Sequence, residues 1–214
     1  GEYESAFRSL SEARHLHDEL ETEEKSLEDQ LAFGLIYGLS EQPEAAFETF
    51  LNVRDRAREL GYADVESAAD IRMSRICFDQ GRNEEGLGFT DAALKITDAT
   101  GNREQRAEAL KERGRIRLHQ GQLESAGSDF DEARWILEEI GSRPGYDLLI
   151  CLGDLHTRCG RYVEARTALE SALEHCSVRN IPYGEIMALF HLGNLMSSTG
   201  RMDEAVEYWT RCYR

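Results

Sequence analysis

The chain has 214 residues, of which 41% are hydrophobic and 31% charged, and only three are proline. This composition supports a continuous core built from long helices, and it excludes a disordered chain. The formal net charge of −16 repels phosphate backbones and anionic lipid surfaces, so we expect neither nucleic acid nor a membrane as a partner.

The sequence carries no sign of export or membrane insertion. Its apolar runs fall short of the roughly 18 residues that a membrane span needs, and no segment has the pattern of a signal peptide. The five cysteines are an odd number in a chain too long to need disulfide staples, which predicts reduced thiols. We therefore expect a cytoplasmic protein.

A period of 40 residues organises the chain. In each copy a small residue is followed four positions later by a residue that is large in most copies, a spacing that places both on one face of a helix. The six pairs are Ala6 and Leu10, Ala46 and Phe50, Gly86 and Thr90, Ala126 and Phe130, Ala165 and Leu169, and Ala205 and Trp209. One step, from Ala126 to Ala165, has 39 residues.

The predicted elements follow from these anchors in chain order. Gly1 lies at a turn position, so a second helix is expected over residues 2–20, without a first helix before it. The later turns, near residues 41, 81, 121, 160 and 200, each join a first helix to a second one, so every repeat is an αα-hairpin. The first helices carry a small residue where their partner crosses, at Gly34, Ser74, Gly114, Gly153 and Gly193.

The second helices are expected to end at a second column of residues: Gly61, Gly101, Gly141 and Asn180. Glycine and asparagine accept the left-handed conformation that follows a helix C-terminus, so the asparagine supports the alignment. The one-residue deletion falls in the loop over residues 141–147, where Pro144 also breaks the helix. The third copy matches the repeat pattern less well, because it carries Gly86, Gly88 and Thr90. We therefore expect a less stable helix near residues 84–90.

The pattern L-G-x-x-x-x-x-x-G-x-x-x-E-A, at residues 152–165 and 192–205, resembles that of tetratricopeptide repeats. The resemblance covers the whole chain and is most specific in the last two copies. The 40-residue period is similar to the longer repeats of Leu-Gly-Asn repeat adaptors, kinesin light chains and the sensor arms of bacterial regulators. It implies an all-α fold, a right-handed solenoid of antiparallel helix pairs with about 11 helices, forming one domain over residues 1–214.

Solenoid ends normally carry polar caps, and this chain begins and ends inside second helices. We therefore expect it to be a fragment of a longer protein.

Few side chains have a spacing that suggests chemistry. Adjacent acids on a helix project about 100° apart, and a histidine with one cysteine gives two ligands where zinc needs four. The pairs concerned are Glu84 with Glu85, Glu138 with Glu139, His15 with His17, His156 with Cys159, and His175 with Cys176. No phosphate-binding loop, dinucleotide fingerprint or nucleophile motif occurs. We expect no enzyme activity, no cofactor and no metal.

The family resemblance implies that the first helices line a concave groove that binds a protein partner. The residues that it assigns to this groove are Leu31, Leu35, Ile71, Arg75, Phe78, Lys111, Arg115, His119, Ile150, Asp154, Arg158, Phe190 and Asn194. Four of them are cations and one is an acid, so the groove would attract an acidic peptide or an amphipathic helix. The alternative is that these cations pair with neighbouring acids such as Glu108, Glu112 or Asp147 and only solubilise the surface.

The leading interpretation is a protein–protein interaction scaffold that holds a peptide or helix in this groove. The main alternative is a regulatory arm of a larger enzyme or transcription regulator, in which the groove binds the protein's own neighbouring domain. A third is end-to-end self-association through the exposed edge that carries Trp209 and Tyr213.

Overall fold

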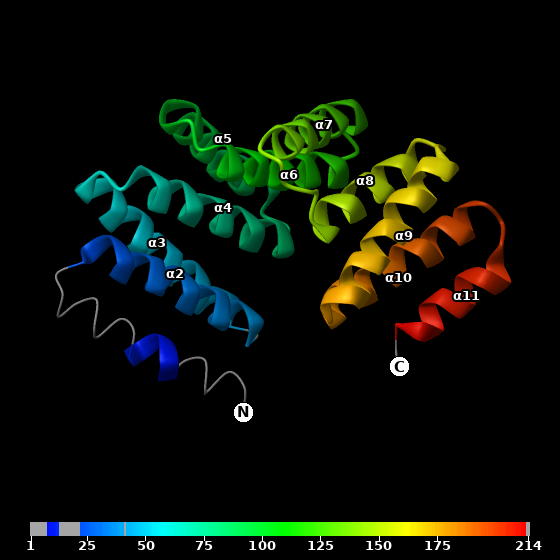
Figure 1. Cartoon of the computed structure of the whole chain (residues 1–214), viewed down its shortest axis with the longest axis horizontal. Coiled ribbons are helices and arrows are strands. Elements are labelled where there is room, and N and C mark those ends of the chain that lie inside the picture. The colour runs from blue at the N-terminus through cyan, green and yellow to red at the C-terminus, as the bar shows by residue number, and fades with distance from the viewer. Residues whose placement is uncertain (1–7, 13–21, 41, 213–214) are drawn as a thin grey trace. The chain divides into compact units, whose positions relative to one another are not determined.

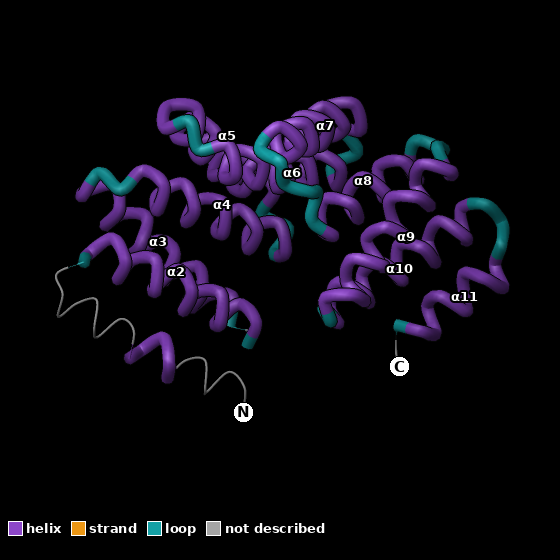
Figure 2. The backbone as a smooth tube through the Cα atoms, viewed as in Figure 1, coloured by secondary structure: helices purple, strands orange, loops and turns teal. Residues whose placement is uncertain are grey.

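The computed structural model of the chain describes residues 8–12, 22–40 and 42–212 (Figure 1). Every regular element in these ranges is a helix (Figure 2), which confirms the predicted all-α fold. Of the helix expected over residues 2–20, residues 8–12 are helical, and Ala6 and the rest of that segment lie outside the described residues. Tyr213 also lies outside them.

The described helices alternate between first and second members of a pair, as the repeat predicts. The first helices are α2 (Glu23–Leu39), α4 (Ala63–Asp79), α6 (Arg103–His119), α8 (Tyr146–Arg158) and α10 (Pro182–Ser198). The second helices are α3 (Pro43–Leu60), α5 (Asn83–Thr100), α7 (Leu123–Glu139), α9 (Tyr162–Arg179) and α11 (Met202–Arg211).

The chain forms two compact units, Gly1–Glu112 and Arg113–Arg214. In the first unit α2 packs on α3, and α4 packs on both α3 and α5. In the second unit α8 packs on α7 and α9, while α10 packs on α9, α11 and α8. Within each unit a first helix thus contacts its own partner and the second helix before it, as α4 does with α5 and α3 and α10 does with α11 and α9.

The two helices of a pair cross where a small residue of the first meets a large residue of the second. A Cβ atom added to Gly153 would lie 2.5 Å from Leu169 Cδ2, and one added to Gly114 would lie 2.6 Å from Phe130 Cε1. Atoms at these distances overlap, so only glycine allows the helices to approach this closely. The predicted small–large crossing is confirmed at these positions.

The same crossing recurs in the other described repeats. A Cβ at Gly34 would overlap the Phe50 ring, and one at Gly193 would overlap the Trp209 indole. In the third repeat the corresponding residues are Ser74 and Thr90, and both are fully buried. The close crossing thus recurs wherever the first helix carries a glycine at this position.

The ends of the second helices adopt the predicted left-handed conformation. Gly61 has φ 80° and Asn180 has φ 51°, and each caps its helix through its backbone N–H. Asn180 is the only non-glycine residue with positive φ among the described residues. A β-branched residue at either position would be strained, so the turn that starts the next repeat depends on this residue type.

A buried ion pair ties α6 to α7 beside their crossing. The Asp129 carboxylate is 4% exposed, and it accepts hydrogen bonds from Arg113 Nη2 and Arg117 Nη1, both at 2.7 Å. A buried carboxylate is stable when its oxygens are paired in this way.

The α7–α8 connection departs from the other repeats. Helix α8 has 13 residues, whereas α2, α4, α6 and α10 each have 17. Pro144 interrupts the helical path, and Gly145 is extended, with φ −67° and ψ 162°. The loop predicted over residues 141–147 therefore replaces the first turn of α8.

We predict that Gly153→Val lowers the free energy of unfolding by about 1–3 kcal/mol, because the added side chain overlaps Leu169. Gly127→Ala is the matched control on α7, since its Cβ would lie at an ordinary 3.5 Å from Leu155 Cδ2. Urea denaturation followed by circular dichroism measures both. Equal stability of the Gly153→Val variant and the wild type would show that the crossing tolerates bulk.

We also predict that Gly88→Ala stabilises the third repeat. Gly88 lies inside α5, and a Cβ there meets no atom within 4 Å, so alanine gains about 0.5–1 kcal/mol of helix stability. Amide exchange over residues 84–90 is expected to be faster than over residues 162–173 in the wild type and to slow in the variant. Exchange that is equally slow in both segments of the wild type would contradict the expected softness.

Candidate binding surface on the first helices

The first helices of unit Gly1–Glu112 lie side by side. Helix α2 contacts α4, and Ser67 of α4 donates a hydrogen bond to the Gln105 side chain at the start of α6. Gln105 Nε2 in turn donates to the backbone oxygen of Asp64, at 3.0 Å. These contacts place α2, α4 and the beginning of α6 in one row.

The predicted groove residues of this unit differ in accessibility. Leu35 is 41% exposed, and Leu31, Arg75 and Phe78 are partly exposed. Ile71 is only 3% exposed and Lys111 only 6%, so neither presents a surface to a partner. The interpretation of these two as contact residues is therefore corrected. Ile71 lies on α4, against which α2 packs.

The cations of this unit are engaged by acids. Arg75 Nε lies 3.3 Å from Asp79 Oδ2, and Arg75 Nη1 lies 3.8 Å from Glu112 Oε1. Lys111 Nζ lies 2.7 Å from Glu108 Oε1 and 3.6 Å from Glu112 Oε1. Pairing with Glu108 and Glu112, the alternative left open by the sequence, is thus observed here.

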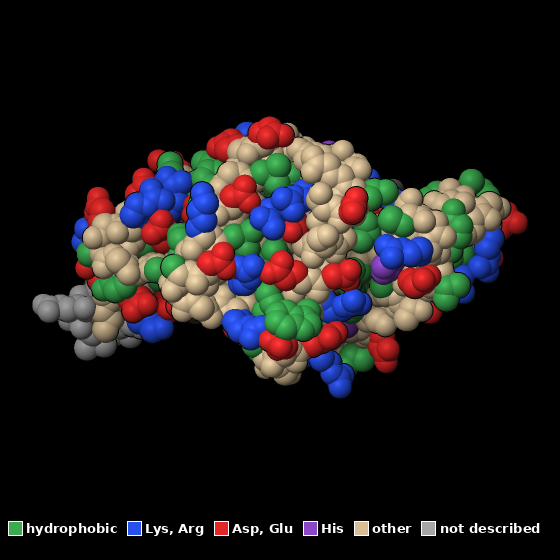
Figure 3. All heavy atoms as spheres, turned by 90° about the horizontal axis from the view of Figure 1, so that it is seen from above, with side chains coloured by type: hydrophobic (Ala, Val, Ile, Leu, Met, Phe, Trp, Pro, Cys, Tyr) green, Lys and Arg blue, Asp and Glu red, His purple; other side chains and the backbone are tan. Residues whose placement is uncertain are grey.

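Unit Arg113–Arg214 contains a second row of first helices. Arg158 Nη1 donates to the backbone oxygen of Leu118 at 3.1 Å, which joins the end of α8 to the end of α6, and α8 packs on α10. Arg158 also pairs with Asp154, at 3.1 Å between Nη2 and Oδ2. Figure 3 shows acidic and basic side chains interspersed over one face of the molecule, in keeping with such local pairing.

The remaining predicted residues lie in this second row. Arg115 and Asn194 are partly exposed, and His119 is exposed. Ile150 is 7% exposed and belongs to the core cluster with Leu169 and Leu192, so its interpretation as a contact residue is corrected as well. Phe190, one helix further on, is 47% exposed.

Two exposed apolar residues of α10 were not singled out from the sequence. Tyr183 is 59% exposed and Ile186 is 44% exposed. With Phe190 they follow the spacing i, i+3 and i+7, so the three side chains share one helical face. We call these three residues the α10 stripe. The helical spacing of these three residues could have been found in the sequence, but the exposure of their side chains could not.

The surroundings of the α10 stripe disfavour the charged form of its neighbouring histidine, His191. Burial lowers the pKa of His191, with the Asp154 carboxylate opposing and the Arg158 guanidinium reinforcing this shift. The His191 ring lies edge-on to Phe190, at 5.6 Å between centroids.

The residues considered for chemistry do not converge. Glu84, Glu85, Glu138 and Glu139 are all exposed on their helices. Burial lowers the pKa of His156, and its possible zinc partner Cys159 is exposed. Within residues 8–12, 22–40 and 42–212, no three histidine, cysteine or acidic side chains gather as metal ligands would. None of the helices described there has the length and apolarity to cross a membrane.

Comparison with known proteins agrees with this geometry. Residues 147–214 match the family model described as tetratricopeptide repeat. No curated protein sequence matches the chain significantly. The match supports the predicted resemblance to tetratricopeptide repeats over these residues.

Solved structures share the fold over nearly the whole chain. BtubC from P. vanneervenii is 20% identical, with a TM-score of 0.70 over 99% of this chain and 88% of that one. The apo form of RapI is 14% identical, with a TM-score of 0.72 over 98% and 90%. A Rap protein complexed with Competence and Sporulation Factor is 13% identical, with a TM-score of 0.71 over 100% and 72%.

One buried acid in the first unit has an unusual environment. The Asp70 side chain is 1% exposed, and its nearest cationic atom is Arg54 Nη1, at 3.9 Å. Among the described residues, Asp70 Oδ2 and Ser74 Oγ, one turn apart on α4, are buried without a hydrogen-bond partner. Burial raises the pKa of Asp70 to about 6, although the Arg54 guanidinium opposes this shift.

This environment predicts a pH-dependent stability. Because the folded pKa of about 6 exceeds the ordinary value of 3.8, the folded state binds the proton more tightly, and Asp70 lowers stability as the pH rises from 4 to 6. Relative to wild type, Asp70→Asn should therefore gain up to about 3 kcal/mol of unfolding free energy between pH 4 and 7. Urea titrations at both pH values measure this, with the exposed Asp79→Asn on the same helix as the control. An unchanged difference between Asp70→Asn and wild type would refute the raised pKa.

Proposed function

We propose that this protein is an interaction scaffold whose first helices hold an amphipathic helix or peptide of a partner protein, and that it has no catalytic role. The observation that carries the proposal is the α10 stripe. Tyr183, Ile186 and Phe190 together expose large apolar side chains along one face of a first helix. Contiguous exposed apolar surface of this kind is typical of interaction sites rather than of inert protein surface.

The packing of the other first helices suggests how a partner binds. The register of Phe190 is occupied by Ile71 in α4 and by Ile150 in α8, and both are buried where other first helices lie alongside. A partner helix laid against α10 would bury the α10 stripe in the same manner. Such a ligand needs apolar side chains at i, i+3 or i+4, and i+7 on one face.

The charges favour an amphipathic ligand over a purely acidic one. Arg75, Lys111 and Arg158 are already paired with acids of their own surface, so their attraction for an anion is reduced. Arg158 keeps 42% of its side chain exposed within its pair with Asp154. Exposed pairs of this kind are weak, so a ligand carboxylate can share Arg158 and orient the bound helix.

Proteins of similar fold support a binding role. Repeats of paired helices create extended surfaces for partners, and the similar Rap protein was solved in complex with Competence and Sporulation Factor. For the present chain, we infer a protein or peptide ligand. The net charge of −16 disfavours binding to nucleic acid and to anionic membranes.

The proposal is tested by removing the α10 stripe. A variant with Tyr183→Ser, Ile186→Ser and Phe190→Ser should lose the partners that the wild type captures from the source lysate, with at least a tenfold drop in recovery by quantitative mass spectrometry. The matched control changes three exposed apolar residues of second helices, Val163→Ser, Met202→Ser and Val206→Ser, which are 78%, 53% and 52% exposed. Thermal melting verifies that both variants fold.

The two variants separate the possible outcomes. Partners retained by the control and lost with the α10 stripe support binding on the first helices. Partners lost only by the control would place the binding surface on the second helices and contradict the proposal. Arg158→Glu, tested in parallel, should weaken capture about fivefold if the ligand shares that guanidinium.

A further inference from the structure

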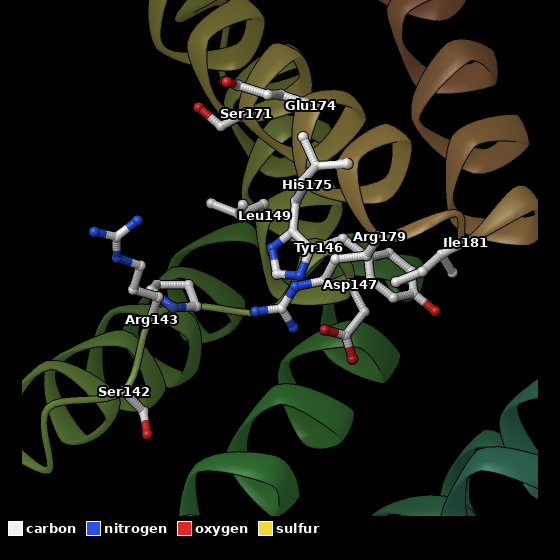
Figure 4. A pocket seen from close by; sticks show the side chains of 13 residues that line it. Ser142, Arg143, Tyr146, Asp147, Leu149, Ser171, Glu174, His175, Arg179 and Ile181 are labelled. Carbon is white, nitrogen blue, oxygen red and sulfur yellow. The ribbon is translucent and has the colours of Figure 1, made fainter.

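A cavity of about 970 Å³ lies in unit Arg113–Arg214, and none of its lining residues belongs to the α10 stripe. It is bounded by the α7–α8 loop, the start of α8, the second half of α9 and the residue before α10 (Figure 4). Its size is in the range of small-molecule sites. The residues that matter for the argument are Arg143, Tyr146, Leu149, His175, Arg179 and Ile181.

The cavity exists because α8 is short. The other first helices have 17 residues, but α8 begins at Tyr146 and has only 13, so it lacks about one turn. The loop over residues 142–145 runs where that turn would be, and it leaves the side chains of the last turns of α9 without the usual neighbour. The loop that contains Pro144 thus leaves a concave site beside α9.

The cations of the cavity differ from those of the first-helix surface. Within the described part of the chain, neither Arg143 nor Arg179 has a carboxylate within 4.0 Å, whereas Arg75, Lys111 and Arg158 are all ion-paired. In Figure 4 the Arg179 side chain extends from α9 towards the loop that carries Arg143, whereas the Arg143 side chain points away from the Arg179 guanidinium. These two guanidinium groups, on separate elements, are therefore available to a ligand.

The cavity lining also contains two acids, Asp147 and Glu174. Asp147 Oδ1 accepts a hydrogen bond from the Leu148 backbone N–H, at 3.0 Å, in the first turn of α8. Glu174 is exposed on α9, and the described residues include no cation within 4.0 Å of it. In Figure 4 its carboxylate points away from the Arg179 guanidinium.

The remaining wall is aromatic and aliphatic. The Tyr146 ring packs edge-on to His175, at 6.3 Å between centroids, and Leu149 and Ile181 line the same space. Tyr146 also packs against the core cluster that includes residues of α8 and α10. The ring contact and this packing together hold Tyr146 in place. The cavity therefore offers an apolar surface beside two cations.

We propose that this cavity binds a small organic anion with an aromatic or aliphatic body, its carboxylate or phosphate held by Arg143 and Arg179 and its body against Tyr146 and Leu149. Guanidinium groups bind both kinds of anion through paired N–H donors, so the shared chemistry is the anionic group. The site shares no lining residue with the α10 stripe, and its test does not depend on the scaffold role.

Titrations followed by ¹H–¹⁵N NMR of the full chain test the proposal. The probes are N-acetyl-phenylalanine for a carboxylate and phenyl phosphate for a phosphate, each to about 10 mM, which detects millimolar binding. The uncharged amide of N-acetyl-phenylalanine is the matched control ligand. We expect at least one anion to shift the amides of residues 142–149 and 171–181, and the control to shift them at least tenfold less.

Variants then assign the anion to its cations. Arg143→Gln and Arg179→Gln should each weaken binding of the active probe about fivefold to tenfold, while Arg161→Gln, an exposed arginine outside the cavity, should leave it unchanged. Arg143 is in a loop and Arg179 at a helix end, and unchanged NMR dispersion verifies folding. The proposal is overturned if neither anion shifts these amides, if the uncharged control shifts them equally, or if Arg161→Gln weakens binding as much.

Discussion

The close crossing of two helices, small residue against large, is the contact on which the rest of the structure depends. Gly153 against Leu169 and Gly114 against Phe130 leave no space for a Cβ atom on the first helix. This contact fixes the distance between the helices of a pair, and the left-handed caps at Gly61 and Asn180 then redirect the chain into the next pair. Because the second helix takes one face of each first helix, a different face of that helix remains for a neighbour or a partner.

That division of faces explains where binding surfaces occur. Where first helices flank one another, their shared register is buried, as at Ile71 and Ile150, whereas on α10 the same register exposes Phe190. Surface cations beside these helices are neutralised by local acids, as in the pair of Arg158 with Asp154. The α8 cavity has a different origin, since it arises from the loss of one helical turn and keeps two arginines without acidic partners in the described chain.

Much of the fold could be predicted from the sequence because it follows from local rules. The crossings, the turns and the caps each require particular residue types at fixed spacing. Asn180 replaces glycine at one cap with positive φ, which shows that the cap requires a backbone conformation rather than glycine itself. The site was less predictable. The burial of Ile71 and Lys111 and the pairing of Arg75 depend on which helices lie alongside, a tertiary property that helical periodicity does not contain. The cavity was missed because a one-residue deletion says nothing about the turn that α8 loses.

The most direct test of the central contact is a double-mutant cycle of Gly153→Ala and Leu169→Ala, with unfolding free energies from urea denaturation. If the two residues are complementary in shape, the clash caused by Gly153→Ala is relieved when Leu169 is also shortened, and the double variant is more stable than the sum of the single losses predicts by about 1 kcal/mol or more. Strict additivity of the two substitutions would contradict the account, because it would mean that the helices are held at their distance by other contacts.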